Sequence, residues 1–121
     1  MKNRLQTIGA IAAITFFSSV AVAEQTDEGR FFYGGSELLS LCESSHTYET
    51  NECHIYLMGV SDTLQTMKSW GYYEYVCVPK DVYASQLRKV IIRDFNEQPE
   101  KLHLTASSLA INALGNAFPC E

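Results

Sequence analysis

Apolar side chains recur at three- and four-residue steps through most of the sequence after residue 35, which is the period of a helix with one buried face. Turn signals divide this pattern into four segments. We expect helices over about residues 36–42, 52–70, 83–96 and 105–118. No segment shows sustained two-residue alternation, so strands are not expected. The pattern predicts an all-α domain.

The second segment carries the longest apolar stripe. Its predicted inward positions are Cys53, Tyr56, Leu57, Val60, Leu64 and Met67. Gly59 interrupts the stripe at a cost of about 1 kcal/mol relative to alanine, so we expect another helix to approach closely there. Gly71 stands where a left-handed residue would end the helix. Trp70 is expected to complete the stripe as a core residue.

The other helices show shorter stripes. Ser36 is the expected N-cap of the first helix, and Thr105 that of the fourth. The run "ESSHTYETNE", residues 43–52, is expected to be a loop, because Ser, Thr and Asn side chains offer hydrogen bonds that compete with helix. In the third helix Arg88 is expected to face outward. The remaining inward positions are Leu38, Leu41, Cys42, Leu87, Val90, Ile91, Phe95, Leu109, Ala113, Leu114, Ala117 and Phe118.

Four helices joined by short loops pack most simply as an up-down-up-down bundle. In that layout Cys42 ends the first helix beside Cys53 at the start of the second, and Cys77 and Cys120 meet at one end of the bundle. The other two pairings would need a rearrangement. We therefore predict a small four-helix up-down bundle stapled by two disulfides, Cys42–Cys53 and Cys77–Cys120.

The first 23 residues have the pattern of a cleaved signal peptide. Lys2 and Arg4 precede an apolar run over residues 8–20, and "AVA" offers a cleavage site before Glu24. The run is too short to span a bilayer, and membrane insertion is not expected. An even number of cysteines in a small exported domain favours disulfides.

These features predict three regions: a signal peptide over residues 1–23, a flexible segment over 24–34 and a helical domain over 35–121. Cleavage would remove two of the nine Lys and Arg residues, leaving seven against 14 Asp and Glu and a net charge of −7. No basic run is present, so nucleic acid is not an expected partner. An acidic domain would instead be steered towards a basic surface.

Catalysis, metal binding and a cofactor are not expected. His46 and His54 lie near two cysteines and several glutamates, but the spacing contains no C-x-x-C or H-x-x-x-H pair for zinc. No serine lies in a G-x-S-x-G elbow. Gly34-Gly35 lacks the pattern of a phosphate-binding loop. Protein binding is therefore the favoured class of function.

Two connections are candidate contact regions. Tyr72, Tyr73 and Tyr75 follow Gly71, and neighbouring side chains in such a segment cannot all point inward. Tyr and Trp are favoured anchors of protein interfaces. The alternative is that these tyrosines form a lid over the core. The second region precedes the fourth helix and offers Glu97, Glu100 and His103, which also fit solvated charges and a loop histidine.

Four stretches in order, "GSELLSLCES", "CHIYLMGVSD", "CVPKDVYASQLRKVI" and "QPEKLHLTASSLAINALGNAFPC", resemble the Rap/Tai family of type VI secretion immunity proteins. The resemblance covers about residues 35–120. It departs at Asp81 and Tyr83, where the family usually has Gly and a capping Thr. The aromatic run before Cys77 is also longer than is typical.

The resemblance implies a small helical periplasmic protein, often a homodimer, that occludes the active site of a secreted cell-wall amidase effector and is not itself an enzyme. An alternative of another class is a periplasmic stress or chaperone protein without a dedicated toxin. Lipid carriage would need a wider apolar face than the last two helices display.

Overall fold

A computed structural model describes residues 31–121, which form four α-helices and one short 3-10 helix. The elements are α1 (Gly35–Glu43), α2 (Thr47–Ser69), α3 (Ala84–Glu97), η1 (Pro99–Lys101) and α4 (Ala106–Ala117). Within residues 31–121 there are no strands, only two isolated antiparallel bridges. The predicted all-α, four-helix fold is confirmed. The predicted signal peptide, and residues 24–30 of the predicted flexible segment, lie outside the described residues.

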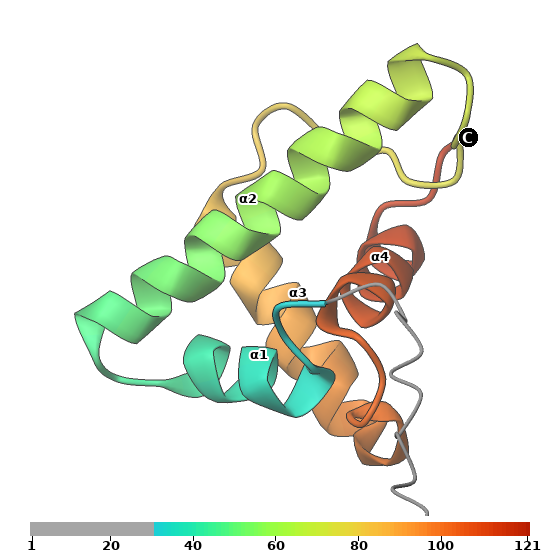
Figure 1. The fold of residues 1–121 in the computed structure, drawn as a ribbon. Coiled ribbons are helices and arrows are strands. Elements are labelled where there is room, and N and C mark those ends of the chain that lie inside the picture. The colour runs from blue at the N-terminus through green and yellow to red at the C-terminus, as the bar shows by residue number, and fades with distance from the viewer. Residues whose placement is uncertain (1–30) are drawn as a thin grey trace, which may run out of the picture.

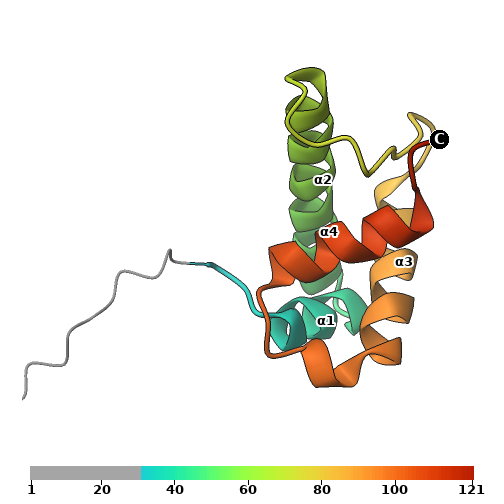
Figure 2. The same cartoon turned by 90° about the vertical axis from the view of Figure 1, so that its right-hand side faces the viewer.

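The helices surround one core. Figure 1 shows α2 as the longest helix, with α1 near its start, and Figure 2 shows α4 lying across α2 and α3. Each of the four α-helices contacts the other three. The largest fully buried side chains are Phe95, Leu38, Leu57, Ile91, Leu114, Cys42 and Cys53. Most predicted inward positions are therefore buried where the helical period places them.

Both predicted disulfides are present. Cys42–Cys53 joins the end of α1 to α2 across a sequence separation of 11, and both cysteines are fully buried. Cys77–Cys120 joins the segment before α3 to the tail after α4 across a separation of 43, and both cysteines are only half-buried. One bond is therefore part of the core, whereas the other closes the surface at one end of the domain.

The expected loop over residues 43–52 is wrong, because α2 begins at Thr47. His46 is the N-cap, and Glu49 in the first turn suits the positive end of the helix dipole. Thr50 lies inside the helix, where its hydroxyl donates to the Ser44 carbonyl at 3.0 Å. Polar side chains in the first two turns can face water, so they do not prevent helix formation there.

Arg88 was expected to face outward and is instead half-buried against α1. Its Nε donates to the Cys42 carbonyl, and a terminal nitrogen donates to the Ser44 carbonyl at 3.3 Å. The last carbonyls of a helix lack partners within the helix, and a positive charge suits that end. Arg88 therefore caps α1 from α3, an interaction that the pattern of a single helix does not predict.

Tyr33 fixes the chain before α1, although it belongs to the segment predicted to be flexible. Its ring packs edge-on against Tyr56 with centroids 5.5 Å apart, and its hydroxyl donates to Glu52. This donation to the Glu52 carboxylate raises the pKa of Tyr33. The Tyr33 carbonyl accepts the Ala106 N–H at 3.0 Å, beside an antiparallel bridge that joins Gly34 to the residue before α4.

The N-cap of α1 is Gly34, two residues before the expected Ser36. The Gly34 N–H donates to the Glu37 carboxylate at 2.8 Å. A Cβ atom on Gly35 would lie 2.5 Å from Cδ1 of Leu109 and 2.9 Å from the Leu102 carbonyl oxygen. Because one of these neighbours is backbone, a side chain at this position cannot be relieved by a rotamer change alone.

We expect Gly35→Ala to lower the free energy of unfolding by about 1–3 kcal/mol, since α1 must move away from the turn before α4. Thermal unfolding measures the change. The expectation that another helix approaches closely at Gly59 is wrong, because nothing lies within 4 Å of a Cβ atom built there. Gly59→Ala is therefore the matched control. Because Gly59 lies in a helix interior, Gly59→Ala should raise the free energy of unfolding by about 0.5–1 kcal/mol. Equal changes in the free energy of unfolding of the two variants would contradict a close contact between Gly35 and the turn before α4.

Candidate protein-binding surface

The chain reverses after α2 through a glycine C-cap, which creates an aromatic loop, defined here as residues 70–76. Gly71 has a φ of +74°, and its N–H donates to the Lys68 carbonyl at 2.9 Å. The Tyr72 N–H donates to the Met67 carbonyl at 3.0 Å. These two bonds form a Schellman motif, which needs a left-handed residue at the glycine. The predicted C-cap at Gly71 is confirmed.

The aromatic loop exposes three large rings. Trp70, Tyr72 and Tyr75 are 67%, 76% and 75% exposed. The expectation that Trp70 completes the core is wrong: Trp70 is the C-cap residue of α2, and its ring is exposed. Edge-on contacts join Trp70 to Tyr72 and Tyr73 to Tyr75, with centroids 6.3 and 5.4 Å apart.

Tyr73 differs from its neighbours because it is half-buried and packs against the core. The loop therefore combines the two arrangements considered from the sequence: one tyrosine covers the core, and its neighbours face water. A Tyr73 substitution would change packing as well as any contact with a partner. Tyr72 and Tyr75 are the cleaner probes of this surface.

The far end of the aromatic loop is held against the tail after α4. Val76 is 3% exposed and forms an antiparallel bridge with Pro119. The Cys77 N–H donates to the Phe118 carbonyl at 2.8 Å, and Cys77 is bonded to Cys120. With a Schellman turn at one end and a disulfide at the other, the exposed rings are presented on a constrained segment. Such a segment loses little conformational freedom on binding.

The second candidate region, Glu97, Glu100 and His103, lies in and beside η1. All three side chains are exposed. The His103 ring shares a hydrogen bond of 2.9 Å with the Glu100 carbonyl, so it helps to shape its own loop. The loop also packs on α1, where the Ser36 N–H donates to the Leu102 carbonyl at 3.0 Å.

The structure does not bring the two candidate regions together. Figures 1 and 2 show the loop after α2 and the η1 turn at opposite ends of the domain. Helix α2 has 23 residues, which corresponds to a length of about 35 Å. A single small loop or pocket of a partner could not contact both regions. As candidate contacts they are therefore alternatives, unless the partner has a much larger footprint.

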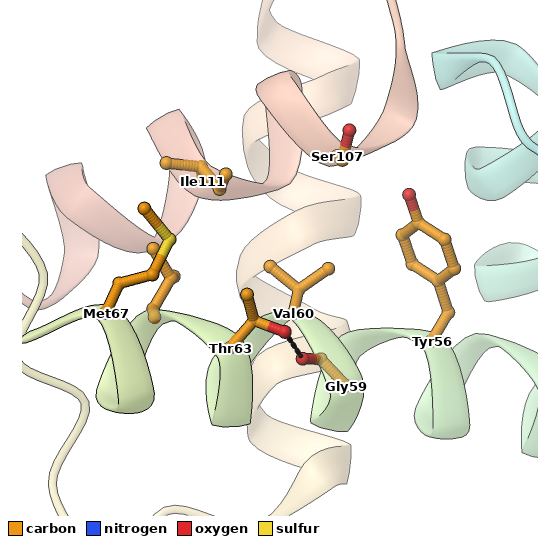
Figure 3. A pocket seen from close by; sticks show the side chains of 8 residues that line it. Tyr56, Gly59, Val60, Thr63, Met67, Ser107 and Ile111 are labelled. Carbon is orange, nitrogen blue, oxygen red and sulfur yellow. Dashed lines mark hydrogen bonds between the residues drawn. The ribbon is translucent and has the colours of Figure 1, made fainter. Parts of the chain in front are cut away.

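An open apolar groove lies between α2 and α4, as Figure 3 shows. Its volume is about 420 Å³, and its lining residues are Tyr56, Gly59, Val60, Thr63, Leu64, Met67, Ser107 and Ile111. Burial at the groove wall raises the pKa of the Tyr56 phenol. Sequence reasoning missed this surface because it assigned Tyr56, Val60 and Met67 to the core.

Among residues 31–121, the candidate metal-binding side chains do not gather into a site. Within residues 31–121, no three His, Cys, Asp or Glu side chains are grouped so that they could hold a metal ion. His54 has a buried Nε2 atom without a hydrogen-bond partner, whereas His46 is exposed at the start of α2. In the same part of the chain, no helix is long and apolar enough to cross a membrane.

The sequence that forms these surfaces matches a family of known proteins. The curated proteins contain no match to the chain. A family model described as Rap1a immunity proteins matches residues 34–120, which span all four helices and both disulfides. The chain therefore belongs to the Rap1a immunity protein family.

Proposed function

We propose that this protein acts in the periplasm as an immunity protein that binds and occludes the active site of a type VI-secreted peptidoglycan amidase. Membership of the family implies that the chain binds a cognate effector protein and points to binding, not catalysis. The amidase target, the periplasmic location and delivery by type VI secretion go beyond family membership and are proposed. The signal-peptide pattern of residues 1–23 and the resemblance of the sequence to amidase immunity proteins support them.

The observation that carries the proposed contact is the exposed aromatic loop. Trp70, Tyr72 and Tyr75 present large rings on a segment fixed at both ends. Rigid aromatic side chains with few rotatable bonds are the usual anchors of tight interfaces, because they bury much area at low entropic cost. An active-site cleft is a concave surface that such rings can fill. The acidic net charge would add electrostatic steering towards a basic rim.

A homodimer is part of the proposal, on the same resemblance. Light scattering on the purified mature chain tests it, with a mass of two chains as the expected result. A monomer at concentrations well above those used for binding would contradict the dimer. It would leave the proposed immunity function standing, since each chain carries its own aromatic loop.

Capture with the oxidised mature domain tests the function. The bait is incubated with periplasmic extract and with culture medium from cells that secrete type VI effectors, and bound proteins are identified by mass spectrometry. We expect one dominant partner with peptidoglycan amidase activity, and we expect the domain to inhibit that activity at one-to-one stoichiometry. Capture of many unrelated clients, strengthened at low pH, would instead support the stress or chaperone function. A bound amidase that remains active would contradict occlusion.

A further inference from the structure

The two disulfides lie in different surroundings. Cys42 and Cys53 are 0% exposed and are enclosed by α1 and α2. Cys77 and Cys120 are half-buried and lie outside the helices, in the segment before α3 and the tail after α4. Thiol–disulfide exchange requires an attacking thiolate to reach a sulfur atom, so access alone favours reaction at the second bond.

A lysine side chain contacts the accessible disulfide. Lys68, in the last turn of α2, places its ammonium nitrogen 2.6 Å from Sγ of Cys77 and 3.8 Å from Sγ of Cys120. A nearby lysine stabilises a thiolate relative to a thiol. When a disulfide is cleaved, one sulfur departs as a thiolate, and the sulfur that better supports negative charge departs faster. The nearer sulfur, that of Cys77, receives most of this stabilisation.

We propose that Cys77–Cys120 is a thiol-exchange site for dithiols, at which the attacking thiolate bonds to Cys120 and Lys68 stabilises the departing Cys77 thiolate. In the first step, a new sulfur–sulfur bond forms to Cys120, the Cys77–Cys120 bond breaks, and its electron pair leaves on Cys77. The second thiol of the dithiol then attacks the mixed disulfide. The dithiol is oxidised to its cyclic or internal disulfide, and Cys120 leaves as a thiolate that takes up a proton. Two electrons pass to the protein.

Timed reduction of the full mature chain with dithiothreitol tests the role of Lys68. Aliquots are blocked with an alkylating reagent, and the four cysteines are assigned by peptide mass spectrometry. We expect Cys77–Cys120 to open first. Lys68→Met should slow its opening about three- to tenfold, whereas Lys68→Arg should restore the rate because it keeps the charge. The Cys42–Cys53 bond of the same molecule is the internal reference and should open at one rate in all three proteins.

Equal opening rates in the wild type and Lys68→Met would overturn the role of Lys68. Opening of Cys42–Cys53 before or together with Cys77–Cys120 would overturn the site itself, because it would show that reduction follows global unfolding. Lys68 is exposed, so both variants should fold. A thermal melt of each oxidised protein checks this, and the ratio of the two opening rates within one sample corrects for any small change in stability.

A monothiol tests which sulfur is attacked. With limiting reduced glutathione followed by rapid alkylation, we expect glutathione on Cys120 and the alkyl group on Cys77. The reverse pattern, or an equal mixture, would contradict attack at Cys120. In Lys68→Met the preference should fall towards an equal mixture, because the charge that distinguishes the two sulfurs is gone.

Opening this disulfide would release one of the attachments of the aromatic loop, while the Val76–Pro119 bridge and the second disulfide remain. The single tryptophan of the chain, Trp70, lies in that loop and should report the release as a change in fluorescence. A consequence for effector binding rests on the proposed function: affinity should fall several-fold after selective reduction. Unchanged affinity with a normal opening order would count against the loop as the contact, but not against the exchange site.

Discussion

Replacing Tyr72 and Tyr75 together by alanine is expected to weaken effector binding by about 2–4 kcal/mol, or about 30- to 1,000-fold, with little change in thermal stability. Both rings are about three-quarters exposed in the isolated domain, so their loss removes little core packing. In a complex the same rings would be desolvated in a cleft of the partner. Binding calorimetry with the captured effector, together with a thermal melt, measures both quantities.

Tyr48→Ala is the matched control for that experiment. Tyr48 is 79% exposed, like the loop tyrosines, but lies in the first turn of α2 at the other end of the helix. It should leave affinity within twofold of the wild type. If the Tyr72/Tyr75 variant binds normally while Glu97→Lys or Glu100→Lys binds weakly, the contact lies at the η1 end and the assignment to the aromatic loop is wrong.

Replacing Cys42 and Cys53 together by alanine is expected to lower the free energy of unfolding by about 4 kcal/mol. About 3 kcal/mol follows from the loop-closure entropy of a separation of 11 residues, and about 1 kcal/mol from the space left by two fully buried sulfur atoms. Small domains have total stabilities of about 5–15 kcal/mol, so this variant should be marginal at 37 °C. Chemical unfolding monitored by circular dichroism measures the loss.

The Cys77→Ala/Cys120→Ala variant separates the contribution of loop-closure entropy from that of packing. Its longer separation of 43 residues predicts about 4 kcal/mol from entropy alone, and its half-buried sulfurs add little from packing. Only the Cys42/Cys53 variant should therefore disturb the core, visible as a larger loss of hydrogen-exchange protection in α1 than in α4. A variant without Cys42 and Cys53 that retains full protection would show that Leu38 and Leu57 hold α1 to α2 without the bond.

The helical segments were predictable because each carries its own periodic apolar stripe. The third helix was expected over residues 83–96 and is Ala84–Glu97. The fourth was expected to begin after Thr105 and does so. The disulfide pairing followed from the helix order, since each predicted pair lies where two consecutive or returning helices end. These features depend on local sequence and simple connectivity.

The candidate surface was predictable only in part. The exposure of Tyr72 and Tyr75 followed from their position after a glycine C-cap, which is local. Trp70 was assigned to the core because it continues the period of α2, but its ring is exposed, and the period alone does not show how far along α2 the neighbouring segments reach. Lys68 could not be recognised as a neighbour of Cys77 and Cys120, since the contact joins segments 9 and 52 residues apart.

The apolar stripe of α2 could be predicted from the sequence, but the burial of its residues could not. Helical periodicity is local, so the sequence predicts that two sets of residues lie along one side of a single helix: Cys53, Leu57 and Leu64, and Tyr56, Val60 and Met67. The packing of the helices buries the first three and leaves the second three half-buried in an open groove, which Leu64 also lines. How much of a stripe is covered depends on where the neighbouring helices cross it. That crossing is set by the packing of all four helices together, with Arg88, Tyr33 and the two disulfides fixing their ends.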